Sequence, residues 1–207
     1  PMEHLSHRYA LNLAWAKDLL VGEDDAGRPM RAIAHRATAV VTAAIGLWNR
    51  LDVGIALPVH LRQSADGYPA PGDSSAATGV GDLVLAPKVA LWVPRDGRGP
   101  GVAVAVDLTF PTGRSRLMGE STVTVTPWVL RGWRFGGPVL ALDLGWKVRK
   151  DVTVRDLGIG DEFRVRLGGE VPVGWRDLSL LAEVDAALGI QGGFWGARGV
   201  SWDTTPV

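Results

Sequence analysis

Two alternating segments within Gly79–Gly113 constrain the fold more than any other part of the sequence. Residues 83–93 carry leucine, valine or proline at every odd position, and residues 102–110 carry valine, leucine or phenylalanine at every even position. The positions between them hold mostly small, polar or charged residues. Because successive side chains of a β-strand point to opposite faces, the pattern predicts two strands, each with one apolar face, joined by the turn PRDGRGPG. Each segment has about ten residues, enough for a tilted strand to cross a bilayer.

The same alternation recurs along the chain and predicts about nine strands. The remaining segments are residues 5–15, 31–47, 51–62, 121–131, 139–149, 162–173 and 178–188. Two of them are ambiguous. In 121–131, Trp128 and Val129 compete for the apolar face, and in 178–188, Leu181, Val184 and Leu188 also fit an amphipathic helix. No apolar run of about 18 residues occurs, which argues against helical membrane spans.

The connections between these strands alternate in length. Those after residues 15, 62, 113, 149 and 189 are long, and those near residues 49, 97, 135 and 175 are short. Transmembrane barrels of bacterial outer membranes have short periplasmic turns and longer external loops. The sequence therefore predicts an all-β fold, an antiparallel up-and-down transmembrane β-barrel, as a single domain over residues 1–207.

Tryptophan placement agrees with two membrane interfaces. Indole rings favour the level of the lipid headgroups, where an apolar body and a polar N–H are both accommodated. Four tryptophans lie beside short turns and two lie near the opposite strand ends. The expected interface residues are Trp48, Trp92, Trp133 and Trp175 on one side, and Trp15 and Trp146 on the other.

Charged residues fall on the predicted inner face. Buried charge is tolerated when it is paired or wetted, so the interior is either plugged by a salt-bridge network or lined by a narrow aqueous path. The expected interior residues are Arg36, Asp52, Arg62, Asp82, Lys88, Asp107, Asp143, Lys147, Glu162, Arg164, Glu170, Glu183 and Asp185.

Several other functions have no support in the sequence. The 22 basic and 22 acidic residues balance, which argues against a nucleic-acid partner, and cysteine is absent. The glycine-rich GVGD at Gly79–Asp82 and GIGD at Gly158–Asp161 are not followed by a helix or a Lys-Ser/Thr pair, as a phosphate loop requires. His4 and His7 would point to opposite faces of a strand. We expect no catalytic residues, no metal site and no cofactor.

The motifs GVGD and LTFPTG at residues 79–82 and 108–113 resemble two groups of outer-membrane proteins. One is the OmpA-like barrels, and the other is the phenol-degradation (MetA-pathway) transporter family. The first resemblance implies about eight strands, and the second implies about twelve and the uptake of small hydrophobic solutes. The nine visible strands favour the second. Single-chain bacterial barrels have even strand numbers, so we expect a complete domain of 10–12 strands, with final strands missing or one hidden in the loop-like tail 190–207.

These observations together predict an integral outer-membrane protein with a structural role or acting as a passive channel for small solutes. Its partners would be membrane lipid and small hydrophobic solutes. PMEHLSH at residues 1–7 shows no signal peptide, so an exported chain would be a mature or trimmed form. The alternative is a soluble β-sandwich binding module, whose strands would also show one apolar face.

Overall fold

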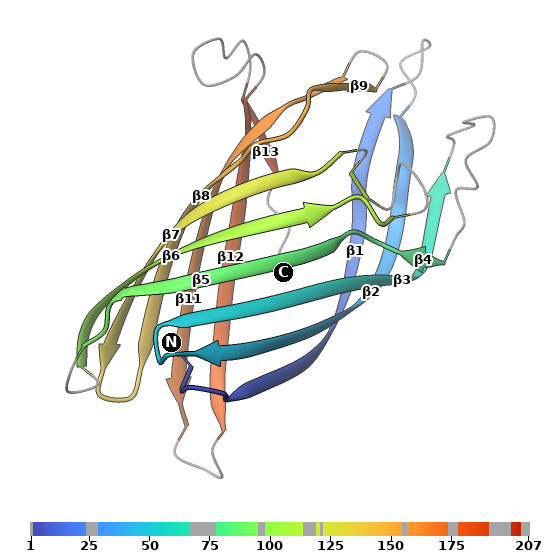
Figure 1. Ribbon diagram of the computed structural model, residues 1–207. Helices are drawn as coiled ribbons and strands as arrows, with labels where there is room; N and C mark the ends of the chain where they lie inside the picture. Colours follow the sequence, from blue (N-terminus) through green and yellow to red (C-terminus); the bar gives the residue numbers. More distant parts are fainter. Residues whose placement is uncertain are drawn as a thin grey trace.

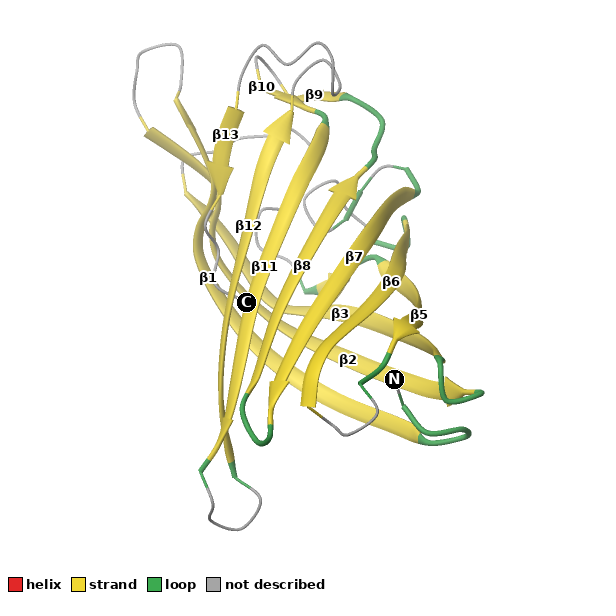
Figure 2. Cartoon of the chain, turned by 90° about the vertical axis from the view of Figure 1, so that its left-hand side faces the viewer, coloured by secondary structure: helices red, strands yellow, loops and turns green. Residues whose placement is uncertain are grey.

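The computed structural model describes residues 2–23, 29–66, 78–94, 98–113, 119–120, 122–154, 157–173, 178–190 and 200–203. Within these residues every regular element is a β-strand (Figure 2). Nine strands are long: β1(His7–Glu23), β2(Pro29–Leu47), β3(Leu51–Asp66), β5(Leu83–Trp92), β6(Arg98–Phe110), β7(Thr124–Phe135), β8(Val139–Lys147), β11(Asp161–Pro172) and β12(Ser179–Ile190). Four are short: β4(Gly79–Val80), β9(Val152–Val154), β10(Leu157–Ile159) and β13(Val200–Asp203).

The long strands form one antiparallel sheet in which each strand pairs with its neighbour in sequence. The order is β1-β2-β3-β5-β6-β7-β8-β11-β12-β13, with β4 paired to β3 and a separate β9–β10 hairpin. The sheet curls into a half-barrel (Figure 1). The predicted all-β, up-and-down architecture and its nine long strands are confirmed. The tail after Ile190, expected to be loop-like, contributes the short strand β13, which pairs with β12.

The two ends of the half-barrel differ in their connections. Residues 48–50 and 136–138 make tight turns at the lower end of Figure 1. Trp48 and Asn49 have φ of 50° and 57°, which a type I′ hairpin turn requires at both central positions. The upper end receives the connections that contain β4 and the β9–β10 hairpin. One expectation was wrong: β1 and β2 pair as far as Glu23 and Pro29, so the link after residue 15 is a strand extension rather than a long loop.

Two β-bulges reset the alternation that the sequence pattern predicts. The β2–β3 register shifts between Ala37, which pairs with Arg62, and Thr38, which pairs with His60, so Leu61 is an extra residue. The β5–β6 register likewise shifts between Ala90 and Trp92. A one-residue shift moves every following side chain to the opposite face.

The convex face of the sheet is apolar and has no second protein layer over it among the described residues. Val41, Ile55 and Val184 on this face have exposed fractions of 51%, 49% and 61%. Alternation along residues 31–47 would place Ile33 on the outer face as well, but its side chain is buried beside shifts in the pairing of β2 with both neighbours. None of the described residues forms a helix long and apolar enough to span a membrane.

Residues 2–6 precede β1 and fold against the turn between β2 and β3. The amide of Leu5 donates to the carbonyl of Gly46 over 2.7 Å, and the amide of Trp48 donates to Nδ1 of His4 over 3.0 Å. The amide of Met2 reaches Oδ1 of Asp52 over 2.9 Å. β1 therefore begins at His7, two residues later than the sequence pattern predicts.

Candidate functional site

The concave face of the sheet carries a row of register partners that crosses six strands. Lys88 on β5 is directly opposite Asp52 on β3, and the two side chains form an ion pair of 2.7 Å. On the other side of Lys88 the row continues through Ala105, Trp128 and Gly145 to Arg164. Because side chains in one row of a ladder share a face, charge and an aromatic ring lie side by side on the inner wall.

Trp128 is the centre of this inner wall. It is 3% exposed, whereas its neighbour Val129 is 54% exposed, so the tryptophan faces inward. Its Nε1 donates to Oδ2 of Asp107 over 2.8 Å, and Cζ of Arg166 lies 4.1 Å from the ring centroid. A buried indole keeps its one N–H satisfied, and its face attracts a guanidinium. The sequence left the orientation of this residue open, and the structure assigns it to the interior.

Arg164 and Arg166 converge on one buried carboxylate, Asp185 of the neighbouring strand. Nη2 of Arg164 is 3.0 Å from Oδ1, and Nε of Arg166 is 2.7 Å from Oδ2. Asp185 is 6% exposed. Asp143 is the register partner of Arg166 on the other side, so acidic residues flank the arginine on two strands. Both guanidinium groups lie beside Trp128, with Cζ of Arg164 5.9 Å and Cζ of Arg166 4.1 Å from the ring centroid.

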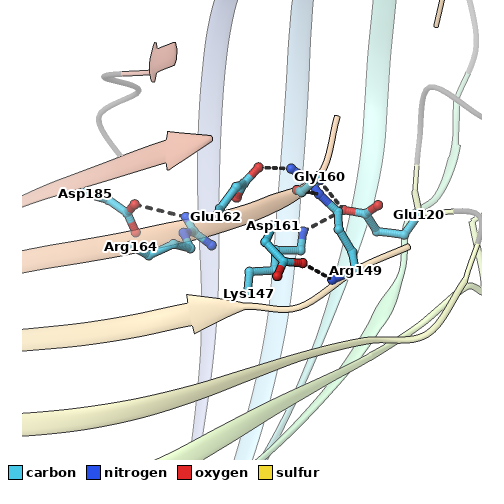
Figure 3. A network of polar contacts seen from close by, with 8 residues as sticks. All are labelled: Glu120, Lys147, Arg149, Gly160, Asp161, Glu162, Arg164 and Asp185. Carbon is cyan, nitrogen blue, oxygen red and sulfur yellow. Dashed lines mark hydrogen bonds and ion pairs between the residues drawn. The ribbon is translucent and has the colours of Figure 1, made fainter. Parts of the chain in front are cut away.

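A second charged cluster lies where the long connections meet the sheet (Figure 3). Oε1 of Glu120 accepts from Nζ of Lys147 over 2.6 Å and from Nη1 of Arg149 over 3.0 Å. Arg149 also pairs with Glu162 and donates from Nε to the carbonyl of Gly160 over 2.6 Å. Burial alone would raise the pKa of Glu120, but the two adjacent cations lower it below its ordinary value. Glu120 lies in a connection, so strand alternation gave no signal for it.

Asp82 ties that connection to the inner face. Its Oδ1 accepts from the amide of Gly113 over 2.9 Å, and its Oδ2 accepts from the amide of Glu120. Next to it, the hydroxyl of Thr112 accepts from the amide of Leu83 over 2.9 Å and donates to the carbonyl of Gly81 over 2.8 Å. Asp82 of GVGD and Thr112 of PTG therefore together connect the start of β5 to the segment after β6 through hydrogen bonds.

The other interior residues predicted from the sequence have varied surroundings. Arg36 donates to Oε1 of Gln63 from Nε over 2.9 Å and from Nη2 over 2.6 Å, and Gln63 is fully buried. Glu170 and Glu183 are exposed on the inner side of β11 and β12, in line with Arg166 and Asp185. Arg62 was wrongly placed, because the bulge at Leu61 turns it outward and gives the inner position to Gln63.

Five of the six predicted interface tryptophans lie among the described residues. Trp15, Trp48 and Trp92 have exposed fractions of 67%, 72% and 64%, and the bulge before Trp92 returns it to the outer face as the register partner of Val102. Trp133 stacks under Arg131, whose Cζ is 5.0 Å from the ring centroid. Trp146 is half-buried and donates from Nε1 to Asp161 over 3.2 Å. Trp175 lies outside the described residues.

The fold and the polarity of its two faces define the structural class of this protein. It is a curled antiparallel sheet with an apolar convex face and a charged concave face. A comparison with protein families identifies the particular group. Residues 34–176 match the family described as "Putative MetA-pathway of phenol degradation", and the chain belongs to this family. The matched residues include GVGD at 79–82 and LTFPTG at 108–113, the two motifs by which the sequence resembles this family. A comparison with curated proteins gives no match.

Proposed function

We propose that this chain is an integral outer-membrane β-barrel protein that lets small solutes pass along its polar inner face. One observation carries the proposal: a single sheet exposes its aliphatic side chains on one face and gathers most of its charged ones on the other. Ile55 is half exposed on the outside, whereas Asp52, three residues away on the same strand, is 5% exposed. In water this arrangement is unfavourable, because apolar surface remains hydrated while charges lose solvation. In a bilayer the same arrangement is favourable, because lipid covers the apolar face.

The inner wall is suited to a narrow aqueous path. Its charges are of both signs and largely paired, as in the Lys88–Asp52 and Arg166–Asp185 contacts, so the wall presents alternating polarity rather than one strong field. Toward the short-turn end the wall carries the exposed Glu170 and Glu183, with Arg134 in the same register row as Glu170. The cluster around Arg149 would form the narrower end of the path, since it draws Glu120 from a connection into the interior.

The family description supports a choice of solute. A family named for phenol degradation fits small aromatic compounds, and the inner wall offers the partly exposed guanidinium groups of Arg164 and Arg166. Arginine donors can bind a phenolic oxygen, and aromatic or cationic surfaces attract a ring. We therefore expect small aromatic solutes to cross faster than sugars of similar size.

The soluble β-sandwich has less support. A sandwich needs a second sheet packed on the apolar face of the first. Among the described residues, the only strands outside the large sheet are β9 and β10, each of three residues. A purely structural barrel with a closed interior remains the competing role within the membrane.

Two measurements test the proposal in sequence. First, the chain expressed with an export signal should fractionate with the outer membrane and change its gel mobility on heating; a chain recovered soluble in the periplasm without a mobility shift would contradict the membrane role. Second, planar-bilayer recordings should show small steady conductances. Asp143→Lys should shift ion selectivity toward anions, whereas Arg131→Ala, on the outer face, should not. An electrically silent barrel would favour the structural role.

A further inference from the structure

The bulge at Leu61 gives the convex face a feature that the rest of it lacks. Trp15, Ala37 and Arg62 are register partners on β1, β2 and β3, so all three lie on the outer side. The next row toward the long connections contains Lys17, His35 and Ser64. Arg62 and Lys17 are exposed. Two basic side chains therefore face outward beside a histidine.

These residues enclose a hollow on the outer surface. A pocket of about 170 Å³ is lined by Trp15, His35, Ala37, Arg62 and Ser64. The rings of Trp15 and His35 lie 5.5 Å apart. Nδ1 of His35 is buried, and among the described residues it has no hydrogen-bond partner. A buried nitrogen without a partner is unfavourable, and this one belongs to a residue that lines the hollow.

The height of the hollow on the sheet points to a lipid headgroup. Below it, three outward rows on these three strands are apolar or aromatic, from Tyr9, Ala43 and Ile55 up to Leu13, Ala39 and Val59. From the turn at residues 48–50 to Arg62, β3 has about the number of residues that a tilted strand needs to cross a bilayer. The outer face therefore changes from aliphatic to cationic at the level where acyl chains give way to headgroups, and Trp15 marks the same boundary.

We infer that this hollow, lined by Trp15, His35, Ala37, Arg62 and Ser64 and flanked by Lys17 as the register partner of His35, binds the phosphate of a phosphorylated glycolipid in the external leaflet. The inference rests on the proposed outer-membrane location, in which the long connections face outward. The guanidinium of Arg62 presents parallel N–H donors that match phosphate oxygens, Lys17 adds a point charge, and the Trp15 ring packs on the sugar or upper acyl carbons. The occupant is a lipid rather than a soluble anion, because the hollow opens on the face that lipid covers.

The test uses the whole chain refolded in detergent and examined by native mass spectrometry with bisphosphorylated lipid A, or with the same lipid after removal of its phosphates. We expect retention of the phosphorylated lipid and about tenfold weaker retention for Arg62→Ala, with a smaller loss for Lys17→Ala. Arg131→Ala is the matched control, since it removes an outward arginine beside a tryptophan, Trp133, from the opposite rim. Retention in this control should equal that of the unmodified chain.

Three results would overturn the inference. They are equal retention of phosphorylated and dephosphorylated lipid, equal losses for Arg62→Ala and Arg131→Ala, and displacement of the lipid by millimolar inorganic phosphate, which would identify a soluble-anion site. Heat-dependent gel mobility of each variant separates these results from misfolding. A chain that inserts into vesicles but shows no phosphate preference contradicts only the lipid site, whereas a chain that fails to insert contradicts the proposed function as well.

Discussion

Trp128 on β7 lies directly opposite Gly145 on β8, and its indole fills the space that a side chain at residue 145 would need. A Cβ at that position would be 2.5 Å from Cε3 of the ring. The glycine therefore allows the tryptophan to lie flat on the inner wall, where Arg166 covers its other side. The positions of Asp107 and Arg166, which contact the indole, therefore depend on the glycine at residue 145.

Gly145→Ala should destabilise the half-barrel because the indole must move and lose its bond to Asp107. Overpacking of this kind costs about 1–3 kcal/mol in the free energy of unfolding. Urea unfolding in lipid vesicles, followed by tryptophan fluorescence, measures the change. Gly132→Ala is the control, since a Cβ there would meet only the carbonyl of Leu140 at 3.8 Å. Equal effects of the two substitutions would mean that Trp128 does not fill this space.

Asp185→Ala should destabilise the chain through the two arginines that it leaves without a counter-charge. The side chains of Arg164 and Arg166 are 27% and 31% exposed, so solvation by water offsets part of the lost ion-pair energy. We expect about 1–3 kcal/mol from unfolding in urea. Glu183→Ala removes an exposed carboxylate from the same strand and should change stability by less than about 0.5 kcal/mol. A double-mutant cycle of Asp185→Asn with Arg166→Gln should show positive coupling, and additive effects would contradict a direct interaction.

Asp82→Asn should release the segment that follows β6. The carboxylate holds the amides of Gly113 and Glu120, and an amide side chain can accept at only one of its two positions. The sequence offers trypsin Arg114 and Arg116 within this connection. Limited digestion of the refolded protein should cut there several-fold faster in the variant than in the unmodified chain. The same rate in both would show that Asp82 does not restrain the segment, and Glu183→Gln serves as the charge-matched control.

The Glu120 cluster should weaken in acid. Lys147 and Arg149 lower the pKa of Glu120 in the folded chain, so its carboxylate contributes stability above the unfolded-state pKa, about 4.3. That contribution is lost as the pH falls through the lower pKa of the folded chain. The difference in melting temperature between the unmodified chain and Glu120→Gln should therefore be constant from pH 7 to about pH 5 and shrink below that. A difference that grows on acidification would contradict this ion cluster.

Alternation along the sequence determined the strands and, for most of them, which face is apolar. The period of two is a local property of the backbone, so patterns such as residues 51–59 or 102–110 predict both the element and its orientation. The charges of Asp52, Lys88 and Arg164 could be assigned to one face in the same way. Their partners could not, because an ion pair depends on which residues of neighbouring strands are opposite each other.

Only the tertiary structure decided the register, the bulges and the residues recruited from connections. The extra residue Leu61 turned Arg62 from the interior to the outer surface, and no local signal in the sequence marks it. The inward position of Trp128 depends on Gly145, seventeen residues away, and Glu120 joins the interior through contacts with Asp82, Lys147 and Arg149. The physical reason is common to all three. Side-chain periodicity is set within a strand, whereas pairing, packing space and charge neutralisation are set between strands that are distant in sequence.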